Sequence, residues 1–157
     1  MQTKEAKTMR RVSKRIISLF LVLVMLLAMI PAGTVLASAA SGSLDMTAEG
    51  LTATYAGDGT WTGGGNVAHG TVTGKGSLFK QSQSGSLTFT NTRSQAGYIS
   101  FDYKITENTG SVTIAGNTVT GSGSYAPSAA LGSGETVQVV IKSGKGNDKT
   151  TSIELTN

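Results

Sequence analysis

The stretch AGYISFDYKIT, residues 96–106, decides the fold of this chain. Every second side chain in it is apolar or aromatic, and the side chains between them are polar: Ile99, Phe101, Tyr103 and Ile105 alternate with Ser100, Asp102, Lys104 and Thr106. A period of two with one apolar face is typical of a β-strand that packs on a core on one side and meets water on the other. We therefore predict that residues 99–105 form the longest, central strand of the core. Its polar face is expected to be merely solvated.

The same alternation recurs along the rest of the chain. Apolar residues alternate with polar ones in segments 51–55, 87–89, 112–119, 137–141 and 153–155. No segment after residue 40 has a helical period, and 20 of the 21 glycines lie there, which disfavours helix. Seven or eight short strands without intervening helices predict an all-β fold over residues 40–157. We expect an antiparallel two-sheet β-sandwich of the jelly-roll or immunoglobulin-like type.

Turn residues separate the predicted strands. The segment 111–120, SVTIAGNTVT, predicts two short strands joined at Gly116-Asn117 by a type II′ turn, because glycine stands first in the pair. Segments 132–135 (GSGE) and 143–148 (SGKGND) have the composition of loops. The similarity of SLTFTN at 86–91 to SIELTN at 152–157 predicts two strands in similar positions of two sheets.

Segment 57–76 differs from its surroundings. It holds eight glycines in twenty residues, together with the only tryptophan and the only histidine of the chain. Either the segment is an irregular, mobile excursion, or its glycines allow the backbone to approach another part of the protein closely.

The N-terminus has the pattern of a secretory signal peptide. Six of the thirteen basic residues lie in the first fifteen positions, an apolar run follows at 16–30, and small residues follow at 34–40. The alternative is an uncleaved membrane anchor, but fifteen residues are fewer than the roughly 20 that span a bilayer. We predict that residues 1–39 are removed and that the protein is secreted or held at the cell surface.

Removal of residues 1–39 changes what the charge implies. The remaining chain has seven basic and eight acidic residues, a net charge of −1, so the sequence pI of about 9.5 belongs to the signal peptide. Nucleic acid and membrane partners therefore lose their support. The chain has no cysteine, but about 118 residues can bury a sufficient core without disulfides. Export without cysteine is common in Gram-positive bacteria.

No motif in the sequence predicts an enzyme, a metal or a cofactor. Position 69 is histidine where a phosphate-binding loop at Gly74-Lys75 would need glycine, and one histidine without cysteine makes zinc unfavourable. A Ser-His-Asp triad would have to use His69, which lies in a glycine-rich segment. Four acidic residues could be paired for glycoside hydrolysis, but they lie on a strand face or in predicted turns: Asp102, Glu107, Glu135 and Asp148.

Sugar binding is the alternative that the aromatic residues support. Secreted sandwiches bind glycans by stacking a pyranose ring on an exposed aromatic face. Trp61 is the best candidate for such a contact, followed by Tyr98 and Tyr125. In a domain with few aromatic residues, however, a tryptophan is more often part of the core.

Four segments carry a resemblance to a known group of proteins: GYISFDYKI (97–105), SVTIAG (111–116), LGSGETVQVVI (131–141) and TTSIELTN (150–157). Together they resemble the β-sandwich modules of secreted and cell-surface proteins of clostridia and related Gram-positive bacteria. The resemblance implies a non-catalytic structural or adhesive module, with a glycan or a host or cell-wall surface as its partner. It equally fits a carbohydrate-binding module. Modules of this group stand in long proteins, so we expect further domains after residue 157.

Overall fold

The computed structural model describes residues 41–76 and 80–157, so the predicted signal peptide lies outside the described residues. The described part consists of strands and loops, and it contains no helix that could cross a membrane. Its eleven strands are β1 (Gly42–Leu44), β2 (Leu51–Gly57), β3 (Thr60–Gly64), β4 (Val67–Thr73), β5 (Ser84–Asn91), β6 (Phe101–Asn108), β7 (Ser111–Ile114), β8 (Asn117–Val119), β9 (Ser122–Tyr125), β10 (Thr136–Lys142) and β11 (Thr150–Thr156).

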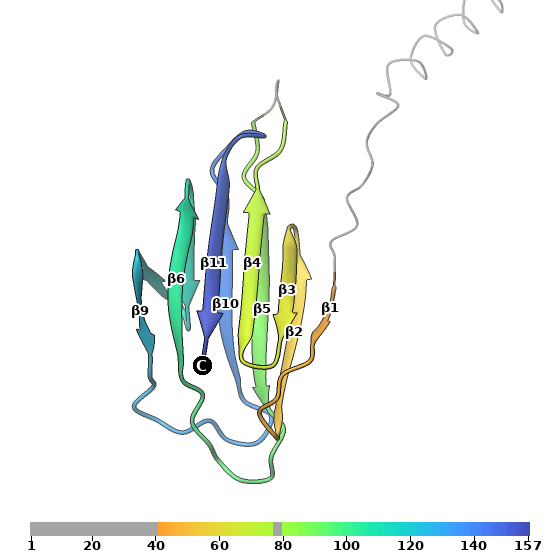
Figure 1. Cartoon of the computed structure of the whole chain (residues 1–157), viewed down its shortest axis with the longest axis vertical. Helices are drawn as coiled ribbons and strands as arrows, with labels where there is room; N and C mark the ends of the chain where they lie inside the picture. Colours follow the sequence, from red (N-terminus) through yellow and green to blue (C-terminus); the bar gives the residue numbers. More distant parts are fainter. Residues whose placement is uncertain (1–40, 77–79) are drawn as a thin grey trace, which may run out of the picture. The chain divides into compact units, whose positions relative to one another are not determined.

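The strands form two antiparallel sheets that pack face to face, which confirms the predicted β-sandwich (Figure 1). One sheet has the order β1-β2-β5-β10-β7-β8 and the other the order β3-β4-β11-β6-β9. Seven of the ten connections between consecutive strands cross from one sheet to the other. In immunoglobulin constant domains, whose sheets are A-B-E-D and C-F-G, the last strand of the chain lies at a sheet edge, whereas β11 lies between β4 and β6. The strand order is therefore not that of an immunoglobulin domain.

The core lies between the two sheets, and the period of two fills it. Fifteen hydrophobic side chains are buried in one cluster: Leu44, Ala53, Trp61, Ala68, Val72, Leu87, Phe89, Phe101, Val112, Ile114, Val137, Val139, Ile141, Ile153 and Leu155. Leu87 and Phe89 of β5 and Ile153 and Leu155 of β11 occupy matching inward positions in strands that are third in their sheets. The two similar hexapeptides therefore do lie in similar positions of two sheets.

The opening stretch has the predicted faces but not the predicted place in the sheet. Phe101 is buried, whereas Asp102 and Lys104 are exposed, so the register is confirmed. The prediction of a central strand was wrong, because β6 lies between β11 and the edge strand β9. The strand also begins only at Phe101, and it shares its length of eight residues with β5. Alternation shows which side chains face the core and carries no information on sheet position.

The hairpin β7–β8 has a different turn from the one predicted. Ile114 pairs with Asn117, which leaves Ala115 and Gly116 as the two loop residues. Both have positive φ, 48° at Ala115 and 81° at Gly116, as type I′ turns require. The prediction of Gly116-Asn117 as a II′ pair was therefore wrong by one residue. Pairing of Val112 with Val119 in the same register explains the shift, because both side chains then face the core.

The glycine-rich segment 57–76 is an ordered hairpin of β3 and β4 at the edge of the five-stranded sheet. Five of its eight glycines mark close approaches, since an added Cβ would lie within 3.0 Å of another atom, as the second of the two alternatives predicted. At Gly70 an added Cβ would lie 2.6 Å from Trp61 Cζ3 and 2.6 Å from Ile141 Cδ1. The Trp61 ring therefore rests on the bare backbone of Gly70.

Candidate functional site

Two long loops of the described chain meet at one end of the sandwich, which we call the loop end. These are residues 92–100, between β5 and β6, and residues 126–135, between β9 and β10 (Figure 1). They pair with each other at Gly97 and Leu131, whose backbone amides each donate to the other's carbonyl, at 2.9 and 2.7 Å. The turn at Gly65-Asn66 and residue Asn157 lie at the same end, since Asn157 N donates to Asn66 O at 3.0 Å.

Asn91 holds the two loops to the sheet. Its side chain is 5% exposed at the end of β5, and its Nδ2 donates to Leu131 O at 2.8 Å and to Gln95 O at 3.0 Å. Its Oδ1 accepts a hydrogen bond of 3.0 Å from the backbone amide of Arg93. Buried side-chain amides in folded proteins are almost always hydrogen-bonded, and the Asn91 amide is bonded through both its nitrogen and its oxygen. The position of Arg93 is thus set by the core of the sheet.

A groove of about 150 Å³ opens at the loop end, and a charged and an aromatic residue, Arg93 and Tyr98, line it with Glu49, Gly50, Ser100 and others. Tyr98 is 69% exposed, and among the described residues it is the large hydrophobic side chain that is exposed to solvent. Its ring is therefore available to a ligand. Ile99 and Asn91 line the inner side of the same groove and connect it to the core.

Arg93 is fixed at this groove by one of its three nitrogens. Its Nε donates to Glu49 O at 2.8 Å. Its side chain lies across Gly50, where an added Cβ would overlap it and where φ is +73°. None of the three ion pairs formed within the described residues involves Arg93. The guanidinium is therefore oriented but not neutralised.

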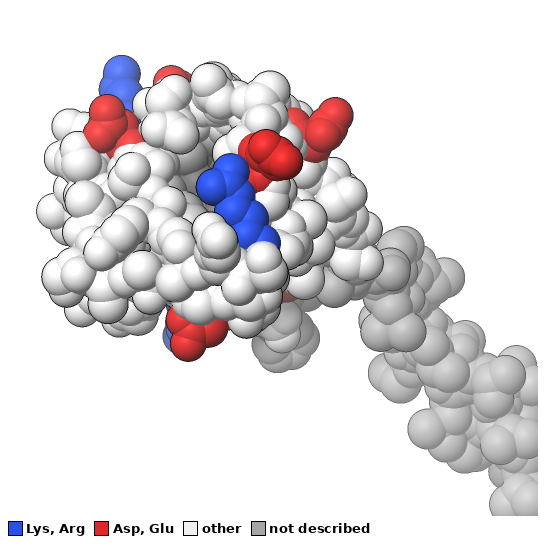
Figure 2. Space-filling view, turned by 90° about the horizontal axis from the view of Figure 1, so that it is seen from below, with Lys and Arg blue, Asp and Glu red and all other residues white. Residues whose placement is uncertain are grey.

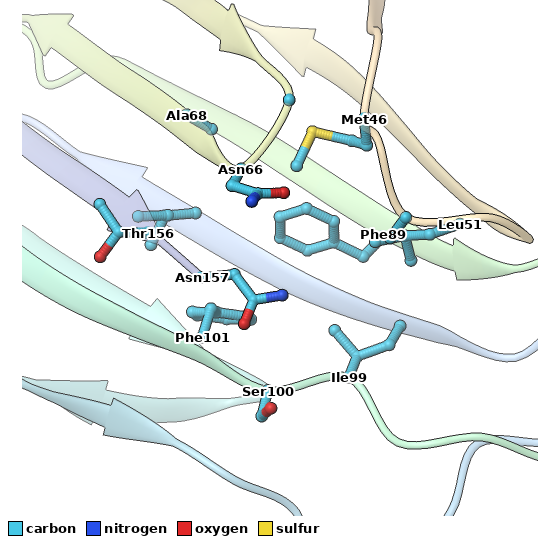
Figure 3. Close-up of a pocket in the computed structure, with 13 residues that line it drawn as sticks. Met46, Leu51, Asn66, Ala68, Phe89, Ile99, Ser100, Phe101, Thr156 and Asn157 are labelled. Carbon is cyan, nitrogen blue, oxygen red and sulfur yellow. The ribbon is translucent and has the colours of Figure 1, made fainter.

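The surroundings of the groove are weakly charged. Figure 2 views the sandwich from the loop end, where acidic and basic side chains are few and a basic side chain in the middle of the view lies beside an acidic one. A second groove of about 270 Å³ adjoins the first through Ser100 and Asn157, and it runs past Asp102 and Tyr125. A mostly apolar pocket of about 30 Å³, partly open to solvent, lies among Met46, Phe89, Ile99 and other residues (Figure 3). That space is smaller than either groove at the loop end and offers less room for a ligand.

The three aromatic residues predicted to bind a ligand are not brought together. Trp61 is 5% exposed with its ring on Gly70, so it is a core residue and cannot serve as a stacking platform. Tyr125 is half-buried and stacks on Phe101, with ring centroids 5.1 Å apart. Tyr98 alone is exposed. The sequence reasoning missed Arg93 and Asn91, because the loop NTRSQAG at 91–97 has no periodicity or motif that marks them.

The residues considered for catalysis are dispersed. His69 lies on the outer face of β4 with Nδ1 3.8 Å from Glu154 Oε2, and no serine hydroxyl of the described chain is hydrogen-bonded to it. Asp102 accepts from Ser124 on a strand face, and Glu135 accepts from the Gly132 amide at 2.6 Å in a turn. The backbone amide of Asp148 and the nearby Lys149 lower the pKa of the exposed Asp148 carboxyl. Within the described residues, no three His, Cys, Asp or Glu side chains lie close enough to share a metal ion.

No family model, no curated protein and no solved structure matches this chain.

Proposed function

We propose that this chain is a non-catalytic structural or adhesive module of a secreted or cell-surface protein. The loop end carries the proposal, because long loops there surround two adjoining grooves and one exposed aromatic ring on a rigid sandwich. Binding residues are commonly placed on loops that a rigid scaffold positions. The dispersion of His69 and the acidic side chains supports a role without catalysis.

Export is supported by the sequence at the N-terminus and by the surface of the domain. Residues 1–39 have the order of a signal peptide, with a basic segment, an apolar segment and small residues. The outward positions of β2 and β5 carry Thr52, Thr54, Thr88 and Thr90, as is usual for a strand face in contact with water. The resemblance to modules of clostridial surface proteins supports the same assignment.

Expression of the full chain in a Gram-positive host tests this proposal. We expect the protein in the medium or on the cell wall, and we expect beads coated with it to adhere to purified cell wall or to host-cell surfaces. The variant Tyr98→Ala should weaken adhesion, whereas Thr54→Ala, on the outer face of the six-stranded sheet, should not. Retention of the unprocessed chain in the cytoplasm would contradict export, and equal adhesion of the two variants would contradict the loop end as the adhesive surface.

Carbohydrate binding is the second candidate, and the exposure of Tyr98 beside a polar groove favours it. A single ring at the rim fits the end of a chain or one sugar unit better than a flat polymer surface, since Trp61 and Tyr125 do not extend the platform. A glycan array separates the two candidates: selective binding that Tyr98→Ala abolishes supports a carbohydrate-binding module. Adhesion to protein-coated surfaces without any bound glycan supports a structural or adhesive role alone.

A further inference from the structure

We propose that the groove at Arg93 and Tyr98 binds an acidic sugar unit, a hexuronic acid of a polysaccharide. The proposal rests on the carbohydrate-binding candidate above and names its site and ligand class. Three observations carry it: the fixed and unneutralised guanidinium of Arg93, the 69% exposed ring of Tyr98, and the groove of about 150 Å³ that both side chains line.

The first step concerns the anion. A guanidinium binds a carboxylate with two parallel N–H···O bonds, and it does so best when its orientation is already set. Arg93 uses Nε on the Glu49 carbonyl at 2.8 Å, so its two terminal nitrogens are left for a ligand. The buried Asn91 holds the backbone amide of Arg93 at 3.0 Å, and Gly50 gives the side chain a place to lie. The loop therefore presents a pair of donors in a defined direction.

The second step concerns the ring. Tyrosine has an apolar face and a polar hydroxyl, which suits it to contact the C–H face of a sugar while it bonds to solvent or to a ligand hydroxyl. In a hexuronic acid the carboxylate is attached directly to the sugar ring. A ring placed on Tyr98 therefore keeps its carboxylate inside the same groove, where Arg93 stands. An anionic polymer without rings, such as a polyglycerol phosphate, satisfies Arg93 but not Tyr98.

The third step concerns selectivity. Polar groups that remain along the groove, the Ser100 hydroxyl and the Glu49 carboxylate among them, suit the hydroxyl groups of a sugar. The contact is exposed to solvent, so a single site binds weakly and its charge-dependent part declines as salt is added.

The test uses the full chain, purified from whichever fraction of the Gram-positive host contains it. Two probes form a matched pair: de-esterified oligogalacturonate and the same oligomer with its carboxyl groups methylated. Polyglycerol phosphate is the third probe, and each affinity is measured by isothermal titration calorimetry. The variants are Arg93→Gln, Arg93→Lys and Tyr98→Ala, with Lys104→Gln as the control that removes an exposed positive charge from the face of β6.

We expect the acidic oligomer to bind about two- to fivefold more tightly than its ester, the difference that one solvent-exposed ion pair contributes. Arg93→Gln should remove this difference, Arg93→Lys should restore part of it, and Tyr98→Ala should weaken both oligomers. Lys104→Gln should change neither affinity. Thermal unfolding of each variant shows whether the variant is still folded. If a variant does not fold, the comparison of the acidic and the esterified oligomer on the unsubstituted protein still tests the preference for the acid.

The failures are distinguishable. Equal affinity for acid and ester, or an equal loss in Lys104→Gln, overturns the acidic-sugar proposal and leaves carbohydrate binding intact. Equal affinity for polyglycerol phosphate overturns the contact with the sugar ring. If no oligosaccharide on a wider array binds either, the carbohydrate candidate fails as well, and the structural or adhesive role alone is left.

Discussion

Replacement of Gly70 by alanine is the sharpest test of how the glycine-rich hairpin packs. The added Cβ would lie 2.6 and 2.7 Å from Cζ3 and Cη2 of Trp61, and 2.6 Å from Cδ1 of Ile141. Carbon atoms in ordinary contact are about 3.5–4.0 Å apart, so both side chains would have to move by roughly 1 Å. Neither has free space, because Trp61 is 5% and Ile141 0% exposed. Overpacking of this kind costs about 1–3 kcal/mol.

Thermal and urea unfolding, followed by the fluorescence of the chain's one tryptophan, measure this cost. For a domain of this size, 1 kcal/mol lowers Tm by roughly 3–5 °C, so Gly70→Ala should lower it by about 3–15 °C. Gly97→Ala is the matched control, since nothing lies within 4 Å of its added Cβ and its φ is not in the left-handed region. The control should be neutral or stabilising by up to about 1 kcal/mol, because it restricts the unfolded chain.

A double variant makes the reasoning refutable. Phenylalanine at position 61 lacks the distal ring atoms that approach Gly70, so the loss in Gly70→Ala/Trp61→Phe should be smaller than the sum of the two single losses. The difference should lie at about 0.5–3 kcal/mol, the range found for residues in contact. Additive losses, or a Gly70→Ala melt that matches Gly97→Ala, would show that Trp61 does not rest on Gly70.

Further predictions concern the core, the turn, the loop anchor and the signal peptide. Phe101→Ala should cost about 3–5 kcal/mol in denaturant unfolding and Asp102→Ala under about 0.5, and similar losses would mean that the register is wrong. Ala115→Asn should stabilise the domain by up to about 1 kcal/mol, because asparagine suits the positive φ of a I′ turn; a loss would contradict that turn. Asn91→Ala should cost at least about 2 kcal/mol and expose the loops to protease, since it removes the partners of the Gln95 carbonyl and of the Arg93 backbone amide. Mass spectrometry of the exported protein should find its N-terminus near Ser38 or Ala40, and a product that begins at Met1 would refute cleavage.

The sequence was sufficient for the sandwich and for which side chains face its core. Alternation in segments such as 137–141 is a local property, set by the pleat of the strand, and it survives in any sheet arrangement. It was insufficient for the place of β6 in the sheet and for the Ala115-Gly116 turn. Those depend on pairing between strands distant in sequence, such as β11 with β4 and β6. The register of a hairpin is fixed by both of its strands. The expectation that glycine comes first in the turn ignored the strands, and it placed the turn one residue too far along the chain.

The candidate site was harder to predict than the fold for a related physical reason. Trp61 drew attention because tryptophan is rare here, yet the feature that buries it is Gly70, its partner across the β3–β4 hairpin. The loop end depends in the same way on a residue without a sequence signal. In the sequence, Asn91 has the position of a polar residue at the end of a strand, which is usually exposed. In the structure it faces inward and is 5% exposed, so its amide must form hydrogen bonds inside the protein.

Those partners are the backbone carbonyls of Gln95 and Leu131, which lie in different loops, 4 and 40 residues from Asn91 in the chain. The buried Asn91 amide bonds to the backbone of both loops, so the loops can keep polar side chains on their surface. The same bonds place Arg93 and Tyr98 along one groove. Rigidity at Asn91 and exposure at Tyr98 are therefore parts of one arrangement. Tests of binding at the groove should accordingly change side chains at its rim and leave Asn91 in place.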